Sequence, residues 1–169
     1  MILTRDVILR EIESGRIVID PFLPEQIGPA SIDLHLGDEI RVMEGGPEVI
    51  DIVEDADYHT VTQIRSLDQP YLLKPGETIH GITREHIHLP GDIGGWLEGR
   101  SRFARLGLMI HITSGFVAPG VENRQVLEMS NVAGRPLMIH AGTRLCQLVL
   151  QRAEGSAIYQ GRFARQDRL

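Results

Sequence analysis

The chain has 169 residues, of which 42% are hydrophobic, and a formal net charge of −6. This length suits a single domain over residues 1–169, and the apolar content excludes a wholly disordered chain. The acidic balance argues against a nucleic acid polymer as partner, because such partners ordinarily meet a broad basic field. No apolar run approaches a membrane span, and acids stand where a signal peptide would be basic and then apolar. We therefore expect a cytoplasmic protein with no membrane partner.

A short helix is predicted near the N-terminus. Thr4 is a suitable N-cap, Asp6 lies where the helix dipole favours an acid, and Gly15 can end the helix. Prolines and glycines then predict an irregular wrapping segment, so that residues 1–28 form the helix and its wrapping. From Ile32 apolar and polar residues alternate up to Gly37–Asp38, which predicts the first strand.

Short strand patterns recur along the rest of the chain, separated by turns rich in glycine and proline. They cover residues 71–73, 78–80, 93–97, 108–113, 125–131, 137–139 and 144–150. Residues 44–69 are acidic and rich in turn residues, which predicts a long excursion over the surface. Residues 155–169 form a tail, basic toward its end and without a clear period, which has the character of a mobile segment. This organisation predicts a mainly β domain.

Three arginines fall within six residues in Arg100–Arg105, a segment between two predicted strands that we call the arginine turn. A turn or short helix there would leave backbone N–H groups beside Ser101, Arg102 and Arg105. Such donors next to guanidinium groups can cradle a phosphate. A charged surface turn without a ligand explains the stretch equally well.

Glu128 is the second candidate for chemistry, because it lies in a predicted strand with Val126 on the same face. Leu127 and Met129 point to the opposite face. If these two face the core, Glu128 is simply exposed. If both faces are covered, as at a subunit interface, shielding raises the pKa of the carboxyl toward the range useful for general acid–base catalysis. The sequence leaves both possibilities open.

The histidines and the single cysteine do not follow a recognised metal-binding spacing. His86 and His88 share one face of a strand without a second pair nearby, and His111 is interpreted as a hydrogen-bonded structural residue of a strand. The chain lacks the H-x-E…P-C-x-x-C signature, which excludes the class of zinc nucleobase deaminases. Cys146 lies in an apolar run and is interpreted as a buried, inert thiol.

Four stretches together resemble the dCTP deaminase family of the trimeric dUTPase superfamily. They are GPASIDLHLG at 28–37, GWLEGRSRFARLGL at 95–108, HITSGF at 111–116 and VLEMSN at 126–131. The resemblance covers nearly the whole chain. It implies a distorted jelly-roll, or β-clip barrel, of the dUTPase-like type, assembled as a homotrimer with active sites between subunits.

The resemblance also implies a reaction, the zinc-independent hydrolytic deamination of dCTP to dUTP and ammonia, which feeds dUMP and dTTP synthesis. Glu128 would transfer protons between water and the base, Ser101 would orient Glu128 and the water, and Arg105 would supply positive charge. Mg²⁺ would arrive bound to the triphosphate, and dTTP is a candidate inhibitor. Substrate contacts are implied for Arg100, Arg102, Ala118, Val126, Leu127, Gln147, Tyr159, Arg165 and Gln166.

Two positions depart from the family pattern. Ala118 stands before Pro119–Gly120, where the family has an acid that activates water in dUTPases and contacts the sugar 3′-hydroxyl in deaminases. Losing a charge-assisted hydrogen bond costs roughly 1.5–3 kcal/mol, which weakens sugar binding about ten- to a hundredfold unless another group compensates. Arg102 replaces a small polar residue and either adds a phosphate contact or crowds the site. Two alternatives stay open: a dUTP diphosphatase, alone or combined with deamination, and a non-catalytic nucleotide-binding homologue.

Overall fold

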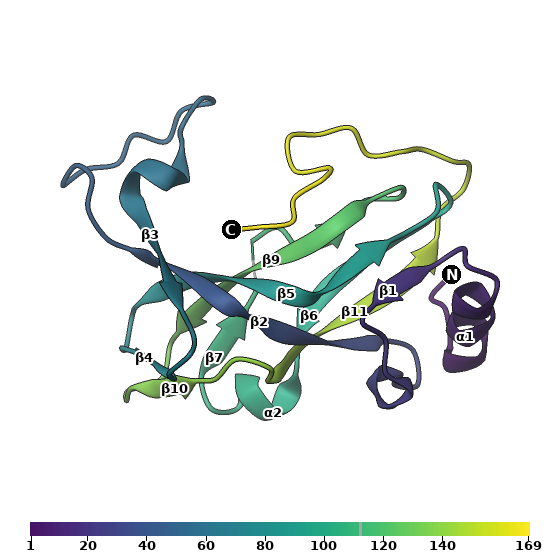
Figure 1. The fold of residues 1–169 in the computed structure, drawn as a ribbon, viewed down its shortest axis with the longest axis horizontal. Coiled ribbons are helices and arrows are strands. Elements are labelled where there is room, and N and C mark those ends of the chain that lie inside the picture. Colours follow the sequence, from purple (N-terminus) through teal and green to yellow (C-terminus); the bar gives the residue numbers. More distant parts are fainter. Residues whose placement is uncertain (112) are drawn as a thin grey trace.

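The computed structural model describes residues 1–111 and 113–169. Its main sheet curls into a half-barrel, with the helix α1 at one end beside β1 and β11 (Figure 1). The strands follow the order β7-β9-β5-β2-β11-β6-β8, with β1 paired to β5 and β3 paired to β2, while β10 and β4 form a small second sheet. The helices are α1 (Arg5–Glu13), η1 (Pro24–Gln26), η2 (Tyr58–Val61) and α2 (Ser101–Ala104). The strands are β1 (Val18–Asp20), β2 (Ile32–Met43), β3 (Thr62–Ser66), β4 (Tyr71–Leu73), β5 (Thr78–His88), β6 (Ile93–Gly99), β7 (Leu108–Ile110), β8 (Phe116–Val117), β9 (Glu122–Asn131), β10 (Leu137–Ile139) and β11 (Arg144–Arg152).

The N-terminal helix lies where the sequence predicts it. Thr4 has the extended backbone of an N-cap, and Gly15 follows the helix with a φ of 71°. The Thr4 hydroxyl donates to the Asp6 carboxylate at 2.6 Å instead of accepting from a backbone N–H. The wrapping segment that follows is more regular than predicted, because it contains β1 and η1. None of the helices in the described ranges is long and apolar enough to cross a membrane.

β2 is longer than predicted, because Gly37 and Asp38 do not end it. Its first half pairs with β11, and its second half pairs with β5 and β3. The register with β5 shifts between Leu36 and Ile40, and a Cβ on Gly37 would lie 3.0 Å from the carbonyl oxygen of Ile82. Glycine therefore permits a close approach at an irregularity inside one continuous strand, where the sequence had predicted a turn.

The predicted surface excursion over residues 44–69 contains an unpredicted edge strand, β3. All of its residues except Thr62 are exposed, so it lacks the apolar alternation by which strands are recognised. β5 also extends to His88, well beyond the predicted residue 80. β7 ends at Ile110, and the predicted strand over 108–113 includes residue 112, which lies outside the described residues.

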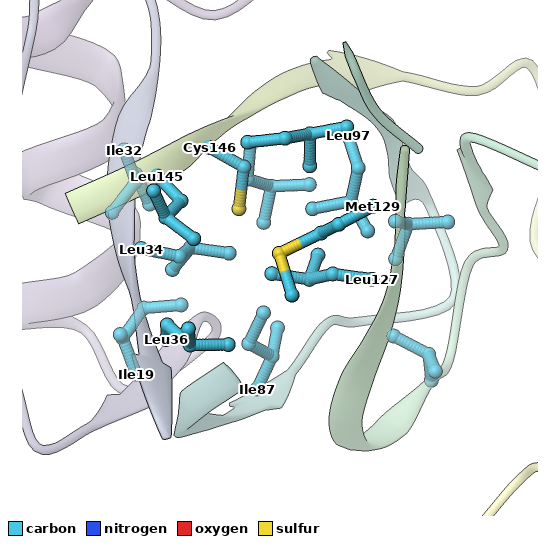
Figure 2. Packing of buried hydrophobic residues seen from close by; sticks show 14 of the residues in the cluster. Ile19, Ile32, Leu34, Leu36, Ile87, Leu97, Leu127, Met129, Leu145 and Cys146 are labelled. Atoms are coloured by element: carbon cyan, nitrogen blue, oxygen red, sulfur yellow. The ribbon is translucent and has the colours of Figure 1, made fainter. Parts of the chain in front are cut away.

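The hydrophobic core lies inside the curl of the sheet. Leu34 from β2, Leu127 and Met129 from β9 and Cys146 from β11 are all fully buried and point toward one another (Figure 2). Burial strongly raises the pKa of the Cys146 thiol, with the carboxylates of the region adding to the effect. The buried position predicted for this cysteine is confirmed.

Candidate functional site

A cavity of about 470 Å³ lies against the part of the sheet where β9 and β5 are paired. Glu128 lines it, and we call it the carboxylate cavity. Four predicted substrate contacts are also among its lining residues: Ala118, Val126, Tyr159 and Gln166. The remainder of its wall is Tyr58, His80, His111, Ser114, Phe116, Val117, Val121, Asn123, Arg124, Gln125 and Phe163. The wall thus combines apolar and aromatic side chains with several polar and charged ones, which suits the binding of a small polar molecule.

Glu128 is oriented and partly shielded within the single chain. Its neighbours Leu127 and Met129 are buried in the core, so of the two possibilities left open by the sequence they take the core face, while the Glu128 side chain keeps 32% of its surface exposed. The hydroxyl of Thr113 donates to Glu128 Oε2 at 2.7 Å. The backbone carbonyl of Glu128 accepts from the N–H of His111 at 2.8 Å. The carboxylate therefore has a fixed direction and one oxygen that already accepts a hydrogen bond.

His80 lies next to Glu128 across the sheet. The two residues are directly paired between β5 and β9, so their side chains share one face. The ring of His80 meets that of Tyr58 edge-on, with centroids 5.7 Å apart. Burial lowers the pKa of His80, which outweighs the opposite effect of Glu128, and Arg41 lowers it further. At neutral pH His80 is therefore an uncharged imidazole beside the carboxylate.

His111 lies on another side of the same carboxylate. It follows the end of β7 with a φ of 58°, and so is not a strand residue as predicted. Its side chain is only 7% exposed, and Nδ1 is 3.8 Å from Glu128 Oε2. Its Nε2 lies 2.8 Å from the backbone oxygen of Ser114, which agrees with the predicted hydrogen-bonded histidine.

The C-terminal segment lies beside β9 and completes the cavity wall (Figure 1). The side-chain amide of Asn123 donates to the carbonyl of Phe163 at 2.7 Å, and the N–H of Arg124 donates to the carbonyl of Gln166 at 2.8 Å. The tail is thus attached to the strand that carries the carboxylate. Arg165, also predicted to bind substrate, is exposed and does not line this cavity.

The arginine turn lies outside the carboxylate cavity. Its central residues form the short helix α2, and the side chains of Ser101, Arg102 and Arg105 are exposed. Neither Arg102 nor Arg105 makes an ion pair with any residue in 1–111 or 113–169. Gln147 belongs with this turn, because its amide lies 3.4 Å from the carbonyl of Gly99. A single chain therefore does not bring the predicted phosphate ligands to Glu128.

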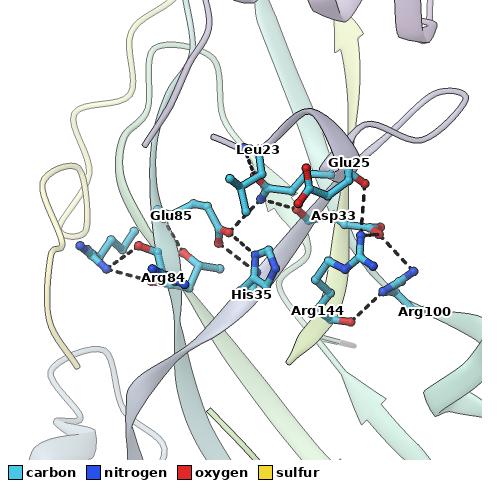
Figure 3. Close-up of polar contacts among 11 residues, drawn as sticks. Leu23, Glu25, Asp33, His35, Arg84, Glu85, Arg100 and Arg144 are labelled. Atoms are coloured by element: carbon cyan, nitrogen blue, oxygen red, sulfur yellow. Dashed lines mark hydrogen bonds and ion pairs between the residues drawn. The ribbon is translucent and has the colours of Figure 1, made fainter. Parts of the chain in front are cut away.

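Arg100 differs from the other arginines of the turn because it is held by a carboxylate. Its guanidinium lies 3.1 Å from Asp33 Oδ2 (Figure 3). The backbone carbonyl of Asp33 accepts from the amide of Gln26 at 2.9 Å, and the same amide donates to the buried Glu85 carboxylate at 2.8 Å. Glu85 also accepts from the N–H of His35 at 2.9 Å. A continuous set of polar contacts thus connects the turn to the interior.

Several residues around the carboxylate were not identified from the sequence, namely Tyr58, His80, Thr113, Asn123 and Phe163. His80 was regarded as isolated from the other histidines, and Glu128, its neighbour across the sheet, lies 48 positions further along the chain. The register between β5 and β9 places His80 beside Glu128. Tyr58, Thr113 and Phe163 reach the cavity from other segments, namely η2, the stretch after β7 and the C-terminal tail. One signal was available in the sequence: Thr78 and His80 are separated by the apolar Ile79, which indicates that both side chains lie on the more polar face of a strand.

Comparison with known proteins identifies one set of relatives. The family model described as dCTP deaminase-like matches residues 2–153. A protein of Acidothermus cellulolyticus named "dCTP deaminase, dUMP-forming" is 39% identical, with 96% of this chain and 90% of that protein covered. A protein of the same name from Methanobrevibacter smithii is 37% identical, with 89% of this chain and 79% of that protein covered.

The fold has a counterpart among solved structures. The crystal structure of 2′-deoxycytidine 5′-triphosphate deaminase from Agrobacterium tumefaciens aligns with a TM-score of 0.71 at 21% identity and covers 90% of this chain. The chain spans about half of that protein, 48% of its length. This likeness confirms the predicted mainly β, distorted jelly-roll fold.

Proposed function

We propose that this chain, which belongs to the dCTP deaminase-like family, hydrolyses dCTP to dUTP and ammonia. The observation that carries the proposal is the position of Glu128. It is a strand carboxylate on the wall of a ligand-sized cavity, fixed by Thr113 and two-thirds shielded by its surroundings. A carboxylate in such a place can accept and return a proton without leaving its position.

In the proposed reaction a water attacks C4 of the cytosine, and Glu128 accepts a proton from this water. Glu128 passes this proton to N3 of the base, which gives a tetrahedral intermediate with a hydroxyl and the amino group on C4. Glu128 then accepts the proton of that hydroxyl and passes it to the amino group, so that the C4–N bond breaks, ammonia departs and the C4 carbonyl forms. The net change is dCTP plus water to dUTP plus ammonia. Val126 and Leu127 would offer backbone groups to the base edge; the Leu127 side chain is buried in the core, which leaves only its backbone for this role.

We propose further that the arginine turn of a second copy completes each site in a homotrimer. In this arrangement Ser101 would orient the water and Glu128, and Arg105 would supply positive charge. Arg100, Arg102 and Gln147 would contact the phosphates. The support for this proposal is the separation of the two halves in one chain, since the turn exposes cations that are unpaired within the described ranges but does not reach the cavity. Symmetric closed assembly would join the two complementary surfaces in every subunit pair.

A second candidate function is the further conversion of dUTP to dUMP, because the curated relatives are named dUMP-forming. The cavity argues against this second step. Ala118 stands at its wall, and Glu128 is the only carboxylate among the described residues that line it. Activation of water at two separate electrophiles, C4 and a phosphorus, ordinarily needs a base near each one. We therefore favour dUTP as the product.

The metal ion and the contacts to the phosphates and sugar form the next part of the proposal. Among the described residues no cluster of three or more histidine, cysteine, aspartate or glutamate side chains could hold a metal ion. Protein ligands for a resident ion are therefore not apparent in these ranges, and we propose that Mg²⁺ accompanies the triphosphate, where it neutralises phosphate charge. Tyr159, Arg165 and Gln166 would cover the phosphates or sugar, and dTTP would compete for the same cavity as an inhibitor.

The test is incubation of the purified protein with dCTP and Mg²⁺ while ammonia and pyrophosphate are measured separately. Ammonia release with dUTP as product supports the proposed function. Ammonia together with stoichiometric pyrophosphate and dUMP would show the second candidate instead. Nucleotide binding by calorimetry without release of ammonia would identify a non-catalytic binding protein.

A further inference from the structure

The imidazole of His111 has a defined hydrogen-bonding state. Its Nε2 lies 2.8 Å from the backbone oxygen of Ser114, which can only accept, so Nε2 carries the hydrogen. In the neutral ring, Nδ1 then presents a lone pair and can only accept. The partner of Nε2 thus fixes both the orientation of the ring and the chemical character of the other nitrogen.

Nδ1 of His111 is buried and has no hydrogen-bond partner among the described residues. The side chain is 7% exposed and lines the carboxylate cavity. Buried polar atoms are rarely left unsatisfied, so this nitrogen calls for a small donor within the cavity. The backbone also points to a specific role, because a φ of 58° is unfavourable for a residue that carries a Cβ.

The nearest acid to this lone pair is Glu128. Nδ1 lies 3.8 Å from Oε2, which is too far for a direct hydrogen bond but short enough for one molecule to contact both atoms. Two acceptors at this separation suit the two hydrogens of one water. Because Thr113 also donates to Oε2, the carboxylate oxygen cannot rotate freely away from this position.

We infer that His111 Nδ1 and Glu128 Oε2 together hold the attacking water, and that His111 is a positioning residue for the deamination. This inference rests on the proposed function. With both O–H groups engaged, the lone pairs of the water face away from the two acceptors and toward the cavity, where C4 of the base would lie. One O–H then points at Glu128, which accepts the proton as the oxygen–carbon bond forms.

The kinetic test uses His111→Gly, since glycine favours the backbone of this position but removes the imidazole. We expect kcat for dCTP to fall about 10- to 100-fold, as for a misplaced reactant, while KM changes less than about threefold. Free imidazole should restore part of kcat. An exposed histidine provides the matched control, His140→Gly, which should keep the wild-type kcat. If His111→Gly keeps kcat within about twofold, the residue only supports the backbone and the inference is wrong.

His111→Asn is the second variant, in case glycine prevents folding. Asparagine also tolerates the left-handed conformation, and its carbonyl oxygen can take the place of Nδ1 as acceptor. We expect a kcat between those of wild type and the glycine variant at unchanged KM. An asparagine variant that folds and loses nucleotide binding rather than turnover would contradict the inference.

A high-resolution crystal structure of the wild-type protein tests the water site without any turnover. We expect an ordered water within about 2.6–3.2 Å of both His111 Nδ1 and Glu128 Oε2. An empty gap, or a direct contact between the two side chains, would overturn the inference. If the ordered water is present but the protein does not deaminate dCTP, the proposed function is wrong, while the water site between His111 and Glu128 is confirmed.

Discussion

The carboxylate cavity and the arginine turn differ in how far one chain completes them. Around Glu128, strands β5 and β9, the segment after β7 and the C-terminal tail all contribute to the wall of one cavity. The arginine turn instead projects Arg102 and Arg105 outward, with Arg100 alone anchored by an acid of the same chain. One chain therefore orients the proposed base, whereas the proposed phosphate ligands of the turn would reach it only from a second copy.

Glu128→Gln should reduce activity more than any other substitution considered for these two regions. The amide keeps the shape of the side chain but cannot accept a proton, so we expect kcat for dCTP to fall at least about 10²- to 10⁴-fold. Nucleotide affinity should stay within a few-fold, as measured by calorimetry. Glu13→Gln, at the exposed end of α1, is the matched control and should retain full activity. Retained turnover in the Glu128 variant would show that another group is the base.

Mixed assemblies test whether the two regions act across subunits. Glu128→Gln and Arg105→Ala subunits should each show strongly reduced activity as pure assemblies. Random co-assembly at equal amounts should restore about a quarter of the wild-type sites, because each site takes the carboxylate from one chain and the turn from its neighbour. Ammonia release after co-expression and purification through two tags measures this recovery. No recovery in verified mixed trimers would place both groups in the same chain.

The arginines of the turn should separate by function. Arg105→Ala removes a cation that lacks an ion-pair partner among the described residues, so we expect kcat/KM to fall about ten- to a hundredfold while the melting temperature is unchanged. Arg100→Ala should lower the melting temperature as well, because Asp33, whose side chain is only 15% exposed, loses an ion-pair partner. Thermal unfolding beside steady-state kinetics distinguishes the two. Equal melting temperatures for both variants would contradict the anchoring role of Asp33.

The smallest expected effect comes from Ala118→Asp, which adds an acid to the cavity wall. A carboxylate that accepts from the sugar 3′-hydroxyl should lower KM for dCTP up to about tenfold. The analogue without a 3′-hydroxyl, 2′,3′-dideoxy-CTP, should show no such gain. Ala118→Asn is the uncharged control of similar shape. An equal change for both nucleotides would place the sugar elsewhere.

Much of the fold follows from local patterns. The helix between Thr4 and Gly15 has its end signals in the sequence, and the alternation around Glu128 correctly separated core residues from the cavity face. β3 was missed because its side chains are mostly exposed on an edge, and the extent of β2 was missed because Gly37 looks like a turn. Organisation as one domain stays a prediction, supported by a single hydrophobic cluster that draws side chains from both ends of the sequence.

The site was predictable only where chemistry and sequence are local. Glu128 and the arginine turn could be proposed from their own segments, but the imidazoles of His80 and His111 could not. Their approach to the carboxylate depends on strand register and on the left-handed backbone at His111, and neither of these is encoded by a spacing. The assignment of roles to Ser101 and Arg105 remains a prediction, because one chain does not bring them to Glu128.

The ion pair between Arg100 and Asp33 would affect the rate of ligand exchange at the proposed phosphate site. A guanidinium that is already immobilised in the free protein loses little rotational freedom when a phosphate arrives, whereas Arg102 and Arg105 must be ordered at that moment. If the turn binds phosphate as proposed, it would combine one stationary cation with two that can follow the ligand as it enters and leaves. Removing the Asp33 carboxylate would free the Arg100 side chain, which would then also have to be ordered when the phosphate binds. We expect this change to slow phosphate binding.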